Sequence, residues 1–132
     1  MLKRLEVKTT TRTQLVDITP HIKSLLRSEN FSTGFIMVYT PHTTCGVTIN
    51  ENADPLVRED IIDTLNRLVP VDIGYGHAEG NADAHIKSSL IGSSENVFVE
   101  SGTLVLGTWQ GIFLVEFDGP RQRSVLIKMV TD

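Results

Sequence analysis

The last third of the sequence is a succession of short strand-like segments, and this feature constrains the fold more than any other. Four apolar runs, rich in β-branched and aromatic residues, are separated by turn-forming residues such as Asp118-Gly119-Pro120. The runs are Val97–Val99, Leu104–Leu106, Gly111–Phe117 and Val125–Val130. Short strands separated by turns predict that this part of the chain is rich in antiparallel sheet.

Four more strands are predicted in the first half of the chain. Apolar and polar residues alternate in Leu2–Thr10 and again in Thr13–Ile18, which predicts a hairpin at the start of the chain. The nearly continuous apolar run Phe35–Thr40 predicts a central strand that is buried on both faces. After an interruption at Pro41, Cys45–Asn50 predicts the next strand.

Three helices are predicted before the final strands. They cover Pro20–Ser28, Pro55–Leu68 and Asn81–Ile91. Thr19 and Asp54 each place a capping side chain before a proline in the first turn, and Gly92 is placed to end the third helix. On that helix, Ile86 and Leu90 are expected to face the core. Helices combined with antiparallel strands predict an α+β fold.

The composition indicates one domain, residues 1–132, that is large enough to bury a core. Apolar residues make up 40% of the chain and charged residues 21%, which excludes extended disorder. The net charge of -4 and the lack of a Lys/Arg cluster argue against nucleic-acid binding. No apolar run approaches the ~20 residues that span a bilayer. With Cys45 as the single cysteine and no signal-like stretch near Met1, the predicted compartment is the reducing cytoplasm.

Polar side chains are most concentrated in the segment His77–His85, which contains two imidazoles, two carboxylates and a carboxamide with only small residues between them. Alanine and glycine contribute little to a core, so packing does not explain this segment. A second polar concentration flanks the predicted strand Cys45–Asn50, with His42 before it and Glu51 after it. We interpret the two concentrations as the halves of one active site.

His42, His77 and His85 are the candidate metal ligands. Each lies in a polar stretch at a predicted element boundary, whereas His21 lies on the first helix and is interpreted as a surface residue. Three imidazoles that leave one position open are typical of catalytic zinc. The spacing alone leaves a second interpretation open, in which these are surface-loop histidines.

Several other polar residues are candidates for the same site. Glu51 and Asp83 can orient the imidazoles or transfer protons, and Asn81 is either a companion of these groups or a helix cap. Candidates for binding a phosphorylated substrate are Thr43, Thr44, Trp109, Arg121 and Arg123. The two arginines are two residues apart at a strand entry and can face the same side, although a solvated strand end explains them equally well.

Four blocks of the sequence resemble the YjbQ family, which is also described as the secondary thiamine-phosphate synthase family. The blocks are Pro41–Pro55, His77–Lys87, Leu106–Gly111 and Glu116–Arg121, in the family's order. The resemblance implies an α+β domain with two packed antiparallel sheets in a sandwich-like core, about three flanking helices and assembly as a homotrimer. It also places the family's histidines at His42, His77 and His85 and its polar companions at Glu51, Asn81 and Asp83.

The activity that the resemblance implies is a weak thiamine-phosphate synthase reaction. A pyrimidine-methyl diphosphate would be joined to a thiazole phosphate, and diphosphate would be released. A divalent metal, either zinc or the Mg²⁺ that suits diphosphate chemistry, would stabilise the departing group together with Arg121 and Arg123. Two other functions stay open: a metal-dependent hydrolase of unknown substrate, and a non-catalytic binder of a small phosphorylated metabolite.

Overall fold

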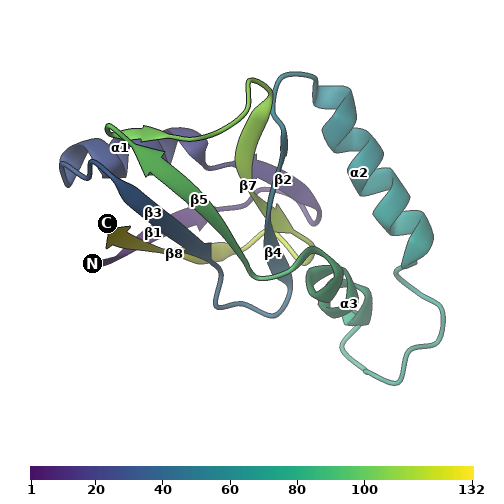
Figure 1. Cartoon of the computed structure of the whole chain (residues 1–132). Helices are drawn as coiled ribbons and strands as arrows, with labels where there is room; N and C mark the ends of the chain where they lie inside the picture. Colours follow the sequence, from purple (N-terminus) through teal and green to yellow (C-terminus); the bar gives the residue numbers. More distant parts are fainter.

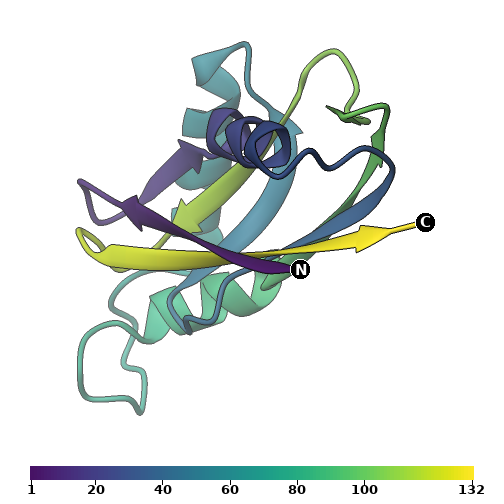
Figure 2. The ribbon, with the colours of Figure 1, turned by 90° about the vertical axis from the view of Figure 1, so that its left-hand side faces the viewer.

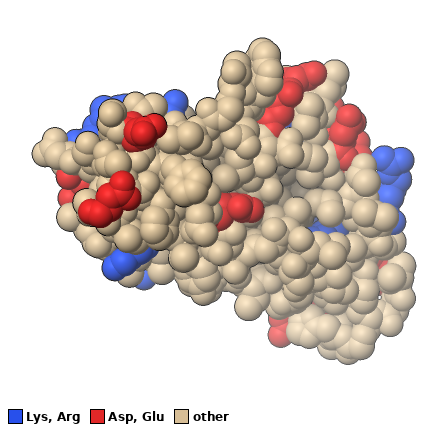
Figure 3. Space-filling view, viewed as in Figure 1, with Lys and Arg blue, Asp and Glu red and all other residues tan.

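Eleven elements follow one another in the computed structural model, which describes residues 1–132 (Figure 1). The strands are β1 (Leu2–Lys8), β2 (Gln14–Asp17), β3 (Gly34–Tyr39), β4 (Cys45–Glu51), β5 (Ser94–Glu100), β6 (Thr103–Leu104), β7 (Gln110–Glu116) and β8 (Gln122–Thr131). The helices are α1 (Thr19–Ser28), α2 (Pro55–Leu68) and α3 (Ala82–Ile91). None of the helices combines the length and apolar character needed to cross a membrane. Acidic and basic side chains are scattered over the face of the molecule that Figure 3 shows.

The strands form two antiparallel sheets. One sheet has five strands in the order β1-β8-β3-β5-β6, and the other has three in the order β2-β7-β4. The long strand β8 pairs with β1 on one side and with β3 on the other. The predicted α+β fold with two sheets and three helices is therefore confirmed. In Figure 2, α1 is seen end-on beside the curled sheets.

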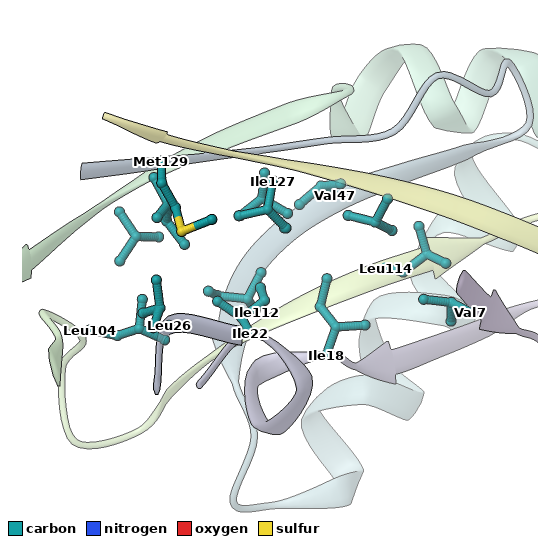
Figure 4. Close-up of a cluster of buried hydrophobic side chains, with 14 of the residues drawn as sticks. Val7, Ile18, Ile22, Leu26, Val47, Leu104, Ile112, Leu114, Ile127 and Met129 are labelled. Carbon is teal, nitrogen blue, oxygen red and sulfur yellow. The ribbon is translucent and has the colours of Figure 1, made fainter. Parts of the chain in front are cut away.

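The main core lies between the two sheets and α1 (Figure 4). Ile22 and Leu26 extend into this core from α1, while Ile112 of β7 and Ile127 of β8 extend into it from the two sheets. These side chains are at most 2% exposed. Full burial of each such side chain contributes roughly 1.5–3 kcal/mol, so this cluster of side chains, distant in sequence, holds the two sheets together.

The predicted opening hairpin is wrong, although both of its strands exist. β1 pairs with β8 in the five-stranded sheet, and β2 pairs with β7 in the three-stranded sheet. The backbone N–H of Thr9 continues the first pairing by donating to the Arg121 carbonyl at 2.9 Å. Alternation of apolar residues reports a half-buried strand but not its partner, which the two-sheet core selects.

β3 is central, as predicted, but it is not buried on both faces. Ile36 and Val38 are fully buried, whereas Met37 and Tyr39 are 38% and 40% exposed. Only one face of the five-stranded sheet contacts the core. The apolar run of β3 therefore has one face that packs in the core and a second apolar face that is exposed to solvent.

The helix starts show which capping predictions hold. Asp54 Oδ1 accepts the Leu56 N–H at 2.9 Å, which is the predicted cap of α2. Thr19 is not a cap, because it lies inside α1 and its hydroxyl oxygen accepts the Ile112 N–H of β7 at 2.8 Å. Gly92 ends α3 as predicted, with a φ of 97°.

The predicted inward face of α3 is wrong. Ile86 and Leu90 are 40% and 62% exposed, while Ala84, Lys87 and Ser88 are buried. α3 packs against β4 at Gly46, where a Cβ atom would lie 2.7 Å from the Gly92 carbonyl oxygen. Because this close approach and a buried ion pair orient the helix, its apolar residues do not decide which face turns inward.

Candidate functional site

A polar pocket of about 500 Å³ lies between α3 and the bend that joins β3 to β4, residues 40–44. We call it the polar pocket. It is lined by His42, Thr43, Cys45, His85, Ser88, Ser89, Gly92 and Ser93. Figures 1 and 2 both show the bend beside α3. The lining contains two imidazoles and several hydroxyl groups but no carboxylate, lysine or arginine. Of the residues predicted for the site, it unites His42, Thr43 and His85.

His42 occupies a place that the sheet would otherwise fill. The pairing of β3 with β8 ends at Tyr39, opposite Leu126, and the chain then turns away at Pro41. The next N–H of β8 that needs an acceptor belongs to Ser124, and it donates to His42 Nε2 at 2.9 Å. A backbone N–H can only donate, so His42 Nε2 is unprotonated and a neutral ring carries its proton on Nδ1.

The surroundings favour this neutral ring. Burial lowers the pKa of His42, and the nearby Arg123 guanidinium lowers it further. The carboxylates of Glu116 and Glu6 act in the opposite direction but do not outweigh these effects. At neutral pH His42 therefore presents Nδ1–H as a hydrogen-bond donor and carries no charge.

His85 and His77 form an aromatic contact. Their ring centroids are 5.4 Å apart and the ring planes are nearly perpendicular, at 83°. His85 is half-buried in α3 and lines the polar pocket, whereas the His77 side chain is 43% exposed, in the loop before α3, and does not line it. His77 Nε2 lies 3.7 Å from Glu79 Oε2. His77 thus contacts the site from outside through His85.

Ser88 is a site residue that the sequence reasoning missed. It is only 8% exposed, lines the polar pocket, and its hydroxyl has no hydrogen-bond partner. Leaving a buried polar group without a hydrogen-bond partner costs roughly 1–3 kcal/mol. A hydroxyl that a ligand satisfies is expected to be unpartnered in the free protein. Ser88 and Ser89 follow His85 by three and four residues, and this helical spacing was the available signal.

Cys45 contributes a small side chain and not a reactive thiolate. It is 1% exposed, and its sulfur lies 3.2 Å from the Thr40 hydroxyl. Burial raises the pKa of the Cys45 thiol above its ordinary value. A protonated thiol is a weak nucleophile, so the chemistry of the pocket rests on its imidazoles and hydroxyls.

The predicted three-histidine metal site is not formed within this chain. No group of three or more His, Cys, Asp or Glu side chains is arranged to hold a metal ion. His42 in particular does not fit such a site, because Nε2 is occupied by the Ser124 N–H. Binding of a metal at Nδ1 would require a neutral ring to carry its proton on Nε2, where two donors would then face each other.

The predicted polar companions do not line the polar pocket. Asp83 is 1% exposed and accepts hydrogen bonds from Lys87 Nζ at 2.7 Å and from Arg12 Nη2 at 2.9 Å, so it is half of a buried ion-pair network. Glu51 Oε2 accepts the N–H of the residue that caps α2, at 3.2 Å. Asn81 precedes α3 without capping it, and its Nδ2 donates to Asp118 Oδ2 at 2.9 Å.

The predicted phosphate-binding residues are also separated. Arg123 is 4% exposed and donates to Glu116 and Thr44. Arg121 is exposed and pairs with Asp118 at 3.1 Å. Trp109 is 62% exposed and lies beside Glu51 and the start of α2, away from the polar pocket. Thr44 is buried, which leaves Thr43 as the only predicted phosphate-binding residue in the pocket.

Comparisons with known proteins identify the family. The sequence pattern of the family described as "UPF0047 protein YjbQ-like" matches residues 3–132. The protein MJ1081 of Methanocaldococcus jannaschii is 51% identical over 132 residues, which are 100% of this chain and 96% of that protein. YugU of Bacillus subtilis is 48% identical over 131 residues, 98% of this chain and 99% of YugU. A crystal structure of a YjbQ/UPF0047 protein from Clostridium acetobutylicum superposes with a TM-score of 0.94 at 48% identity, over 97% of this chain and 99% of that one.

These findings correct the functional expectation drawn from the resemblance. The relatives are named only as UPF0047 proteins, and a similar structure from Sulfolobus solfataricus is described as a protein of unknown function. The predicted thiamine-phosphate synthase is therefore wrong. The metal-dependent hydrolase and the phosphate binder fall with it, because no three-residue metal group forms and no arginine reaches the polar pocket. What the matches over nearly the whole chain do establish is that this protein belongs to the YjbQ (UPF0047) family.

Proposed function

We propose that the protein catalyses proton transfer on a small, uncharged hydroxycarbonyl compound bound in the polar pocket. The observation that carries this proposal is that His42, His85 and Ser88, whose buried hydroxyl has no partner, line the same pocket. His42 donates from Nδ1, His85 is the proton acceptor, and Ser88 binds a hydroxyl group of the substrate. The reaction class is removal and return of a proton beside a carbonyl group.

The chemistry of the lining supports an uncharged ligand. The polar pocket contains no cationic side chain to balance a phosphate or diphosphate and no carboxylate to balance an ammonium group. Hydroxyls both donate and accept hydrogen bonds, which suits a ligand with hydroxyl and carbonyl groups. The volume of the polar pocket, about 500 Å³, is within the range of small-molecule sites.

The state of His42 supports the reaction class. A neutral imidazole that donates a hydrogen bond to a carbonyl oxygen can polarise it and stabilise the enolate-like transition state, as an imidazolium would but without a buried charge. The half-buried His85 lines the same pocket, and imidazole is the side chain used most often for general acid–base catalysis. The two histidines thus have different tasks that follow from their surroundings.

Deuterium exchange tests the proposal. Dihydroxyacetone and glyceraldehyde are incubated with the protein in D₂O, and loss of the proton next to the carbonyl is followed by ¹H NMR. The wild-type protein is expected to accelerate exchange, and His85→Gln is expected to lose most of the acceleration. His21→Gln, on the exposed side of α1, serves as the matched control and should retain it. Exchange at the buffer rate, without changes in the His42 and His85 ring signals, would contradict the proposal.

We also infer that copies of the chain assemble, as the homotrimer that the family resemblance implies. α2 has no fully buried residue. Its apolar residues Ile61 and Leu65 are only partly buried against a second core cluster that includes Phe113 of β7, and together with Val57 they line a groove of about 420 Å³. α2 stands away from the sheets in Figure 1, and an amphipathic helix is stable only when its apolar strip is covered. Sedimentation equilibrium is expected to give about three times the 14.6 kDa of one chain, and the mass of a single chain would contradict the assembly.

A further inference from the structure

A buried ion pair lies beneath the bend that carries His42, and the proposed reaction does not use it. Arg123 and Glu116 are 4% and 0% exposed. The Glu116 carboxylate accepts from Arg123 through Nε at 2.9 Å and through Nη2. It also accepts from the Thr9 hydroxyl at 2.8 Å and from the N–H groups of Phe117 and Asp118 at 3.1 and 3.2 Å. The pair is therefore rigidly held.

The hydrogen bonds also fix the charge of this carboxylate. Burial alone would raise the pKa of Glu116, but the hydrogen bonds from Arg123 and Thr9 outweigh it and hold the pKa below its ordinary value. Glu116 is thus ionised at neutral pH, and Arg123 stays in place as its counter-ion.

Arg123 extends this rigidity to the bend. Its Nη2 donates to the Thr44 hydroxyl at 2.8 Å and lies 3.4 Å from the Thr44 carbonyl oxygen. Thr44 follows His42 by two residues, on the other side of Thr43. The guanidinium therefore joins β8 to the short segment whose position decides where the His42 ring lies.

The residue after Arg123 completes the arrangement. The N–H of Ser124 is the donor that His42 Nε2 accepts, so two consecutive residues of β8 hold the bend. Arg123 holds the backbone at Thr44, and Ser124 holds the ring. One contact alone would leave the imidazole free to rotate or the bend free to shift, whereas the two together fix both.

We propose that Arg123 is a positioning residue for His42, which it holds, through Thr44 and Glu116, against the Ser124 N–H as the neutral ring protonated on Nδ1. This inference deepens the proposed function, because Nδ1–H is the donor assigned to the substrate carbonyl. It also makes a claim about the free protein that does not depend on any substrate.

The charges around His42 are consistent with this role. Arg123 of β8 and Arg121, which precedes β8, disfavour a second proton on the ring, and Glu116 of β7 and Glu6 of β1 favour it. Glu6 is held near the ring by the Ser124 hydroxyl, at 3.1 Å. His85 lines the polar pocket together with His42. Removing Arg123 together with Glu116 takes away two opposing influences on the ring, of which that of the cation is the larger.

Long-range ¹H–¹⁵N NMR of the histidine rings tests the inference on the wild-type protein first. His42 is expected to show a protonated Nδ1 and an unprotonated Nε2 at pH 7. In the double variant Glu116→Gln/Arg123→Met, which leaves no unpaired buried charge, His42 is expected to show both tautomers and a higher pKa. Arg121→Met, which breaks an exposed ion pair just before the same strand, should leave the His42 tautomer unchanged.

Two results would overturn the inference. One is a wild-type His42 protonated on Nε2, and the other is a folded double variant with an unchanged tautomer. If the double variant does not fold, Arg123→Lys keeps the charge but not the second arm to Thr44, and it must show the mixed tautomers. Failure of the proposed function gives a different result from failure of this inference. In that case the wild-type protein shows the Nδ1 tautomer but does not exchange the dihydroxyacetone proton.

Discussion

The two halves of the candidate site are held to the protein in different ways. The bend of residues 40–44 is attached to β8 by hydrogen bonds at His42 and at Thr44. In the loop that precedes α3, His77 Nε2 lies 3.7 Å from Glu79 Oε2, and its ring makes an edge contact with His85. A side chain that takes the place of a sheet partner is fixed in position and in protonation, whereas a histidine on an exposed loop is fixed in neither. Histidines that look alike in the sequence therefore have unlike roles.

The largest expected effect comes from breaking the ion pair beneath the bend. Arg123→Ala leaves the Glu116 carboxylate buried without its partner and is expected to lower the free energy of unfolding by about 3–5 kcal/mol. Denaturant unfolding measures this change. The exposed Arg121 gives the matched variant, because removing a surface ion pair costs about 0–1 kcal/mol. Equal losses in the two variants would show that Arg123 does not hold the bend.

Substitution of the two histidines compares the halves of the site directly. His42→Ala leaves the Ser124 N–H without an acceptor and is expected to cost about 1–3 kcal/mol of unfolding free energy. His77→Ala, in the exposed loop, is expected to change it by less than about 0.5 kcal/mol. His42→Gln retains an acceptor oxygen and should recover part of the loss. A loss at position 77 as large as that at position 42 would refute the difference between the halves.

The pH dependence of stability sharpens the same comparison. The folded protein holds the pKa of His42 below the ordinary value of 6.5, so protons bind more readily to the unfolded chain. This contribution to stability is present above pH 6.5 and is lost as the pH falls through the folded pKa of His42. The melting temperature is expected to fall over this range in wild-type protein, and the fall should be smaller in His42→Gln. Identical pH profiles would contradict the lowered pKa.

The smallest expected effect on stability is at Ser88. Its hydroxyl has no partner, so Ser88→Ala is expected to leave the free energy of unfolding unchanged or to raise it by up to about 1 kcal/mol. The same variant should lose most of the dihydroxyacetone exchange. Ser28→Ala is the control, because its exposed hydroxyl donates to the Leu25 carbonyl at 2.9 Å and does not line the polar pocket. A clear loss of stability in Ser88→Ala would mean that the hydroxyl has a structural partner.

The elements with local signals were predicted well. α2 spans the predicted residues because Asp54 and Pro55 mark its start and Pro70 follows its end. The strand positions followed from alternation, and the end of α3 from Gly92. Such signals depend on neighbouring residues and on the geometry of one turn or strand. They carry no information on which strand lies beside which, and so β1 and β2 were assigned to one hairpin although they belong to different sheets.

The site was predicted only in part, for a related reason. His42 and His85 were identified because imidazoles are rare and lie at element boundaries. Asp83 and Arg123 were selected for their chemistry, but burial with Lys87 and Glu116 turns them into structural ion pairs. Ser88 was missed because serine is common on helices, and only the packing of α3 against β4 buries its hydroxyl.

By itself the sequence determined the fold class, the helices and strands and the presence of two polar concentrations, since backbone geometry and side-chain periodicity set these locally. The tertiary structure alone decided which groups meet. It assigned Asp83 and Arg123 to structural ion pairs, separated His77 from the polar pocket, and chose the ring nitrogen with which His42 accepts. The physical reason is that burial and hydrogen-bond partners set the charge and the proton positions of a side chain, and both depend on residues far away in the sequence.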